Sequence, residues 1–195
     1  MTAHTHRRFA VTFALLGALI IENSLVNYYI GVVLLLTFSR FGGLFPDLDH
    51  HWHSVKEKTD LNWIINKILR WTGAKHRSWQ THSWDIAILF CIASWLVPEV
   101  LYTDYGIISV VDKEILKMIL MGYSLGWFSH LFSDMLNYAG VRLVSWHTYK
   151  IRIVPKKLFS LRFKTGEEWE SFCNSFEKYL NRVLGMLVAI YPFIR

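Results

Sequence analysis

Charged side chains and cysteines are both scarce in this 195-residue chain. Only 18% of the residues are Asp, Glu, Lys or Arg, whereas 53% are hydrophobic, including nine Trp and thirteen Phe. A water-soluble domain of this size has little interior for so much apolar surface, so the composition favours a protein embedded in a bilayer. The two cysteines, Cys91 and Cys173, lie in apolar or amphipathic stretches and predict buried free thiols, not a disulfide framework. Internal repeats are also lacking, and the length predicts one domain, residues 1–195.

Four apolar segments predict membrane-spanning helices. A helix needs about 20 residues to cross the hydrocarbon core, and its backbone groups must be paired internally. The first segment resembles a signal peptide, but no small-x-small cleavage site follows it, so we expect it to be retained. The expected spans are residues 5–21, 26–45, 84–102 and 115–136.

The basic residues alternate along the chain in a pattern that predicts topology. Six Lys or Arg residues lie in 47–83 and seven in 141–168, whereas loop 22–25 has none and loop 103–114 has one. Cytoplasmic loops are enriched in Lys and Arg, so the N-terminus, the 47–83 region and the C-terminal region are expected to be cytoplasmic. The net charge of +6 then reflects the membrane topology, and the basic face of the protein would touch membrane lipids. We expect no direct nucleic-acid binding.

The remaining stretches complete the expected fold. Residues 59–72 have apolar side chains at helical spacing and predict an amphipathic helix at the membrane interface. Residues 148–154 and 158–163 alternate apolar and polar side chains and predict a small β-hairpin, and residues 165–193 predict a last helix. The fold class is therefore mainly α: a polytopic membrane helical bundle of about four transmembrane helices, with an interfacial helix, a small β-hairpin and a C-terminal helix. The hairpin and the last helix are expected to form a cytoplasmic region, residues 141–195.

Side chains of the types that bind metals gather at the cytoplasmic ends of these spans. His130 and Asp134 share one helix face and lie in an apolar run, where an unpaired charge costs about 2.5 kcal/mol or more. Imidazole and carboxylate ligands favour zinc, with manganese as an alternative, and close carboxylates permit one to three divalent ions per chain. The candidate ligands are His6, Asp47, Asp49, His50, His76, His82, His130 and Asp134.

Each of these features also has a simpler interpretation. The stretch PDLDHHWH on its own is compatible with a polar helix end capped by aspartate, and His130 with Asp134 is compatible with a structural intramembrane hydrogen bond. Four other histidines are expected to be solvated or isolated: His4, His51, His53 and His147. The convergence of four separate segments on one membrane face favours the metal site.

Several motifs carry a resemblance to a known family. They are TH near the start, PDLDH after a span, HRSWQTHS, GYSLGWFSHLFSDML and AGVRLVSW, in that order. Over residues 1 to about 170 the chain resembles the LexA-binding, inner-membrane-associated hydrolases, also described as membrane-bound metal-dependent hydrolases. The resemblance implies a multi-pass protein of the inner (cytoplasmic) membrane, the same eight residues as the functional set, and Arg77, Thr81 and Ser83 beside them. The chain departs from the family pattern at two positions, since Ser78 replaces the usual glycine and Arg142 replaces the usual proline. Both lie in loops beside the site and bear on substrate recognition more than on metal binding.

These observations predict an integral membrane metal-dependent hydrolase with its active site towards the cytoplasm. The His-x-x-x-Asp pair is similar to those of zinc-dependent phospholipase C and related single-strand nucleases, which implies a phosphoester substrate by analogy. The position at the membrane favours a phospholipid or a lipid-linked phosphate. The expected catalytic residues are Asp49, His76, Arg77 and His82. Asp47 or Asp49 would bridge metals or orient the water, and the two histidines would be ligands or one of them the general acid. A second metal, or Arg77, would stabilise phosphoryl charge.

Two other functions stay open at this point. The first is a non-catalytic membrane protein, whose structural or sensing metal site accompanies a basic face that docks a cytoplasmic protein partner. The name of the resembled family suggests a transcriptional repressor as that partner. The second is an ion transporter, which is less favoured because its ligands should lie near mid-bilayer on broken helices, whereas these lie at one end.

Overall fold

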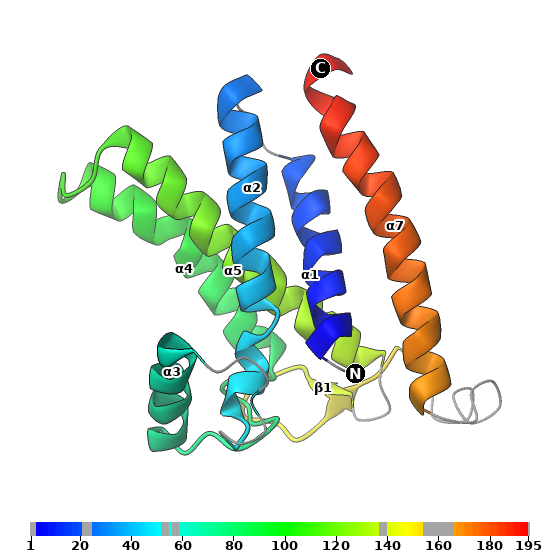
Figure 1. Cartoon of the computed structure of the whole chain (residues 1–195). Helices are drawn as coiled ribbons and strands as arrows, with labels where there is room; N and C mark the ends of the chain where they lie inside the picture. The colour runs from blue at the N-terminus through cyan, green and yellow to red at the C-terminus, as the bar shows by residue number, and fades with distance from the viewer. Residues whose placement is uncertain are drawn as a thin grey trace.

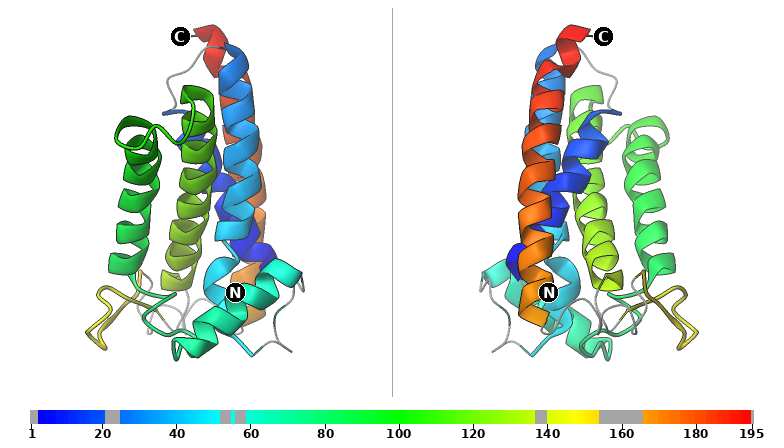
Figure 2. Two further views of the ribbon diagram at one scale, coloured as in Figure 1. Left: turned by 90° about the vertical axis from the view of Figure 1, so that its left-hand side faces the viewer. Right: turned by 90° about the vertical axis from the view of Figure 1, so that its right-hand side faces the viewer.

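Long α-helices dominate the computed structural model, which describes residues 3–20, 25–51, 55, 59–136, 140–153 and 166–194. Within these residues the helices run side by side, and a small two-stranded sheet lies at one end of the bundle (Figures 1 and 2). The long helices are α1 (Ala3–Ala18), α2 (Leu25–Gly42), α4 (Trp84–Thr103), α5 (Val110–Met135) and α7 (Gly166–Ile194). This arrangement confirms the predicted helical membrane bundle with a C-terminal helix.

Three segments meet the length and hydropathy expected of a membrane-spanning helix, where the sequence predicts about four. They are Tyr28–Asp49, Trp84–Thr103 and Val110–Met135, among the residues that the structure describes. The first expected span, 5–21, is the helix α1, which has 16 residues and is shorter than the roughly 20 that a crossing needs. α1 packs against α2, α5 and α7, and its Ala10, Ala14 and Ala18 are fully buried.

Two glycines let α2 and α5 approach each other closely. Gly122 and Gly126 of α5 have the spacing of the GxxxG motif, which lets membrane helices approach closely. A Cβ atom added at Gly126 would lie 2.0 Å from the carbonyl oxygen of Ser39 in α2. The outer surface of α4 is apolar and exposed, for example at Leu89 and Trp95, as expected for a surface that faces lipid.

The predicted interfacial helix is α3 (Asp60–Trp71). Thr59 caps it by accepting the backbone N–H of Asn62. Its apolar side chains Leu61, Ile64 and Trp71 are exposed, which suits a helix lying in the headgroup region. On its other face the buried Asn66 amide donates to the carbonyl oxygens of Leu48 and His50, so α3 holds the short 3-10 helix η1 (Phe45–Asp49) in place.

The sheet lies at a different position from the predicted hairpin. β1 (Val141–Arg142) pairs antiparallel with β2 (Lys150–Ile151), with Arg142 directly opposite Lys150. β2 lies within the first expected strand, 148–154, but its partner precedes it in the chain because the turn at 143–149 closes the pair. The second expected strand, 158–163, lies outside the described residues.

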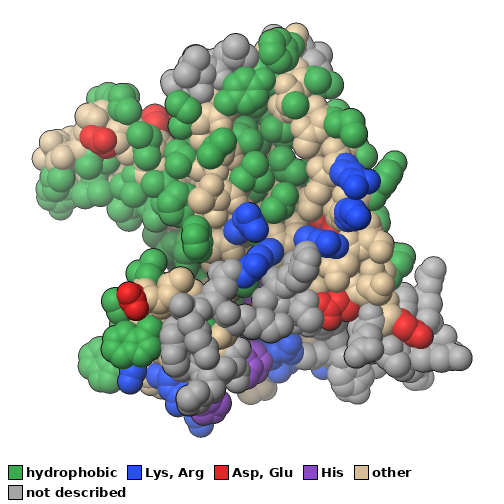
Figure 3. Space-filling model, viewed as in Figure 1, with side chains coloured by type: hydrophobic (Ala, Val, Ile, Leu, Met, Phe, Trp, Pro, Cys, Tyr) green, Lys and Arg blue, Asp and Glu red, His purple; other side chains and the backbone are tan. Residues whose placement is uncertain are grey.

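Charge divides the molecule along its length. Figure 3 shows hydrophobic side chains over most of the upper part, whereas most of the Lys, Arg and His side chains on this face lie in the lower half. At the opposite end, exposed Asp104 lies in the loop between α4 and α5, and exposed Asp112 lies in the first turn of α5. The basic end also contains the N-terminal part of α1 and the sheet (Figure 1).

Candidate metal centre

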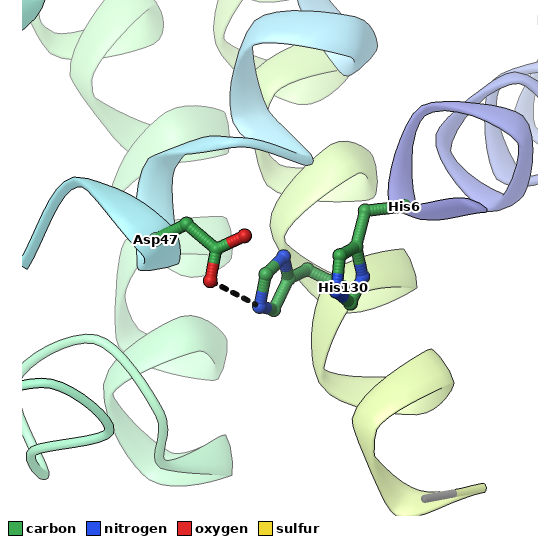
Figure 4. Close-up of side chains that lie close together, drawn as sticks. All are labelled: His6, Asp47 and His130. Atoms are coloured by element: carbon green, nitrogen blue, oxygen red, sulfur yellow. Dashed lines mark ion pairs between the residues drawn. The ribbon is translucent and has the colours of Figure 1, made fainter. Parts of the chain in front are cut away.

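Four separate elements bring the candidate ligands together at the basic end of the bundle. α1 contributes His6, η1 contributes Asp47, the loop before α4 contributes His82, and the last two turns of α5 contribute His130 and Asp134. Figure 4 shows His6, Asp47 and His130 approaching from α1, η1 and α5. Four of the five are almost completely buried, and the side chain of Asp47 is 35% exposed.

Two groups of side chains have the spacing of a metal site. In the described residues, His6, Asp47 and His130 form one group, and His82, His130 and Asp134 form the other, each with ligand atoms within 4.8 Å of one another. The Asp134 carboxylate lies 3.7 Å from His82 Nε2 and 3.8 Å from the Nε2 atoms of His6 and His130. Ligand atoms around a tetrahedral zinc ion are about 3.4 Å apart, so small movements would accommodate one.

The other ring nitrogen of each histidine is occupied by the protein. His130 Nδ1 lies 2.7 Å from the carbonyl oxygen of Gly43, which can only accept a hydrogen bond. Ser133 donates its hydroxyl proton to the His130 carbonyl, so its oxygen accepts from His6 Nδ1 at 2.6 Å. Each Nδ1 therefore carries the proton, and each Nε2 presents a lone pair to the carboxylates.

His82 follows the same rule. The Thr81 hydroxyl donates to Asp49 Oδ2 at 2.5 Å, so Thr81 Oγ1 accepts from His82 Nδ1 at 2.9 Å. Burial lowers the pKa of His82 below its usual value of 6.5, and the hydrogen bond to Asp49 only partly opposes this. The neutral imidazole is thus favoured at neutral pH, with a lone pair on Nε2.

The resulting arrangement of lone pairs fits a cation. His82 Nε2 and His130 Nε2 are buried and have no hydrogen-bond partner among the described residues. A buried polar atom without a partner costs about 1–3 kcal/mol, and a lone pair facing a carboxylate oxygen is repulsive as well. Protonating both His6 and His130 would put two positive charges on stacked rings whose centroids are 3.8 Å apart. Those charges would repel each other, so protons alone do not satisfy every Nε2 atom. A divalent cation between the Nε2 atoms and Asp134 satisfies all of them, so these residues fit a metal.

Asp49 lies behind His82 and is fully occupied by protein groups. Its carboxylate accepts the Thr81 hydroxyl and the backbone N–H of Arg77 at 3.0 Å, and it lies 3.2 Å from His76 Nδ1. A carboxylate in this position orients a ligand histidine and makes it a better donor. The structure therefore places Asp49 as a positioning group and outside both ligand groups.

Arg77 has the only non-glycine positive φ among the described residues, +60°. Such a backbone costs about 1–3 kcal/mol and is often found at functional sites. It lets the Arg77 N–H reach Asp49 while the guanidinium Nη2 lies 3.5 Å from Asp134 Oδ2. The side chain is 28% exposed, so it borders the metal centre and solvent together.

The remaining candidates lie around this centre. The rings of His50 and His76 are 3.9 Å apart beside Asp49, and neither belongs to a ligand group. Burial also lowers the pKa of His50. His51 and His147 are exposed, as expected. His53 and the side chain of His4 lie outside what the structure describes.

Three residues that build the centre were not predicted from the sequence: Gly43, Gly126 and Ser133. Gly126 allows α5 to approach α2, and one turn later His130 reaches the Gly43 carbonyl. The GxxxG spacing in GYSLG was a readable signal for Gly126. The roles of Gly43 and Ser133 depend on which atoms meet across helices, and no local pattern indicates them.

Comparisons with known proteins place the chain in a family. A family model described as YdjM inner membrane protein matches residues 1–190. The chain therefore belongs to the YdjM inner membrane protein family, which confirms the predicted location in the inner membrane. Comparison with curated proteins and with solved structures gave no match.

Proposed function

We propose that this member of the YdjM inner membrane protein family is a metal-dependent hydrolase that cleaves a phosphoester at the cytoplasmic face of the membrane. The observation that carries the proposal is the set of three imidazoles whose Nδ1 atoms are engaged by the protein and whose Nε2 atoms face Asp134. Histidines held in this way are typical of metal centres. The LexA-binding hydrolase resemblance of the sequence is compatible with the same assignment.

The described residues suggest a division of roles. His6, Asp47, His82, His130 and Asp134 would hold the ion. When bound, zinc or manganese polarises a phosphoryl oxygen and lowers the pKa of a water molecule towards neutrality. The partly exposed side of Asp47 is where substrate and water would enter.

Two further side chains are placed to act on the substrate. The guanidinium of Arg77 would stabilise negative charge on the phosphoryl oxygens, because it borders the centre and reaches solvent. The side chain of His76 is 39% exposed and its Nδ1 faces the Asp49 carboxylate, which would stabilise a doubly protonated ring. In that form its Nε2 would give a proton to the leaving oxygen. Asp49 and His82 act here through positioning and ligation.

The distribution of charge supports the cytoplasmic orientation. Arg7, Arg77 and Lys150 lie at the same end of the bundle as the metal centre, whereas the opposite loop carries Asp104. Positively charged loops remain in the cytoplasm during insertion.

A second candidate function is a non-catalytic metal site that holds the bundle together or senses metal, with the basic end docking a cytoplasmic protein such as a transcriptional repressor. The near-complete burial of His6, His82, His130 and Asp134 favours it, since structural sites are closed. The exposure of Asp47, Arg77 and His76 is what favours the enzyme.

Metal analysis of detergent-purified protein, followed by phosphoesterase assays, tests the proposal. We expect the wild type to retain zinc or manganese and to hydrolyse an aryl phosphoester, and chelation to abolish this until metal is restored. His130→Ala should lose both properties, whereas His147→Ala, at an exposed histidine, should keep them. Metal without hydrolysis would favour the second candidate, and no metal uptake by the wild type would exclude both.

A further inference from the structure

A cluster of cations lies beside the metal centre. It consists of Arg77, Arg142, Lys150 and Arg152, and we refer to it as the sheet cation cluster. Arg142 and Lys150 are direct cross-strand partners in the two-stranded sheet. Like charges placed directly opposite destabilise a sheet, and a two-stranded sheet is only marginally stable to begin with. An anion between these side chains would remove the conflict.

Burial makes the unbalanced charge more costly. The Nε atom of Arg142 is buried and has no hydrogen-bond partner among the described residues. The pKa of Lys150 is lowered, first by burial and then by the charges of Arg77, Arg142 and Arg152, while Asp134 opposes the shift. The cluster therefore contains a guanidinium donor without an acceptor and an ammonium group surrounded by like charges.

The cluster borders the metal ligands through two contacts. Arg77 belongs to it and lies 3.5 Å from Asp134 Oδ2. Arg142 forms an isolated β-bridge with Ser83, the residue after His82. The sheet and the metal centre are thus adjacent through Arg77 and through the residue after His82.

We propose that the sheet cation cluster binds the terminal phosphate of a phosphomonoester. This inference rests on the proposed hydrolase function and narrows its substrates from phosphoesters to phosphomonoesters. A monoester carries about two negative charges on three terminal oxygens at neutral pH, whereas a diester carries one charge on two. One or two oxygens face the metal centre, and the others accept from Arg142, Lys150 and Arg77. Guanidinium groups suit this task because their paired N–H groups match phosphate oxygens.

The same phosphate chemistry occurs on membrane lipids and on soluble molecules. The experiment therefore uses full-length protein in detergent with phosphatidic acid in mixed micelles, glycerol 3-phosphate, inorganic phosphate and a bis-aryl phosphodiester. Greater kcat/KM for phosphatidic acid than for glycerol 3-phosphate would assign the phosphate to a lipid, and the reverse would assign it to a soluble ester.

Two variants of the cluster and two controls separate it from the metal centre. Arg142→Gln and Lys150→Gln each remove one charge, and Lys178→Gln removes an exposed charge from α7 as the matched control. Arg142→Lys keeps a positive charge at the sheet. It therefore distinguishes loss of charge from a general folding defect at this position. Loss of a hydrogen bond to a charged group corresponds to about tenfold to a hundredfold, so we expect KM for the monoester to rise by that factor in the Gln variants.

The outcomes distinguish this inference from the proposed function. Unchanged diester KM and unchanged metal content in Arg142→Gln and Lys150→Gln, with Lys178→Gln like the wild type, would support the cluster as the monoester site. An equal rise in KM for monoester and diester, or no rise for either, would overturn it. If no ester is hydrolysed, thermal stabilisation by inorganic phosphate that disappears in both Gln variants would support the phosphate site while the hydrolase proposal fails. Absence of that stabilisation in the wild type would overturn the site.

Discussion

Replacing Gly126 with alanine tests whether the close approach of α5 to α2 sets the metal geometry. A Cβ atom at this position would lie 2.0 Å from the Ser39 carbonyl oxygen and 2.6 Å from the Gly43 nitrogen, whereas real Cβ atoms do not approach closer than 3.0 Å. Both neighbours are backbone atoms, so no side chain can turn aside. The two helices must therefore separate by about 1 Å, because packed interiors have no spare volume.

That separation would reach the metal centre directly. His130 lies one turn beyond Gly126, and its 2.7 Å hydrogen bond to Gly43 would stretch out of range. Metal–ligand distances vary by only about 0.2 Å, so a shift of this size is far outside what a bound ion tolerates. We expect metal affinity to fall by about tenfold to a hundredfold, as on loss of an outer hydrogen bond, and the free energy of unfolding to fall by about 1–3 kcal/mol.

The assay pairs metal titration with thermal unfolding in detergent. Gly185→Ala is the control, because nothing lies within 4 Å of a Cβ atom added there in α7. Alanine is the better helix former by about 1 kcal/mol, so this variant should bind metal normally and unfold at the same or a higher temperature. If Gly126→Ala binds metal with wild-type affinity and unfolds like the wild type, the packing argument is wrong.

Three further predictions concern positioning, pH and orientation. Asp49→Asn should fold but bind metal about tenfold to a hundredfold more weakly, since the carboxylate that orients His82 is lost; isothermal titration with zinc would show this, and unchanged affinity would contradict the positioning role. Burial lowers the folded-state pKa values of His50 and His82, so the unfolded chain takes up protons first on acidification; the stability of the metal-free protein should decline as pH falls below about 6.5, and a flat profile in denaturant titrations from pH 7.5 to 5 would contradict this. In a cysteine-free background, an impermeant thiol reagent applied to intact cells should label Tyr105→Cys and spare Trp146→Cys, two exposed sites at opposite ends of the bundle, and the reverse pattern would invert the proposed orientation.

The spans and the grouping of ligands were accessible from the sequence because both depend on local patterns. Apolar runs of sufficient length predicted α2, α4 and α5, and the i, i+4 spacing of His130 and Asp134 placed both on one face of α5. The packing of the helix α1 was not accessible in the same way, since an apolar run does not reveal which of its residues contact other helices. Its alanines face α2, α5 and α7, which only the packing shows.

The arrangement within the site depended on long-range contacts that local patterns do not encode. The sequence grouped Asp47 and Asp49 as equal candidates, yet the turn of η1 directs Asp47 towards His130 and Asp49 towards Thr81. Likewise, alternation predicted a strand near Lys150, but its pairing with Arg142 depends on where the chain returns after α5. The departure from the family pattern at Arg142 was visible, and only the pairing reveals its charge conflict.

The charges of the site explain why a metal and an anion would bind next to each other. Among the described residues, three carboxylates lie around the histidines: Asp47, Asp49 and Asp134. Asp49 and Asp134 are almost completely buried, so a divalent cation beside them would offset unfavourable negative charge. Once that ion neutralises the carboxylates, Asp134 no longer offsets the neighbouring cations, so the sheet cation cluster becomes a net positive surface. Metal binding should therefore strengthen phosphate binding, and phosphate should strengthen metal binding by the same factor.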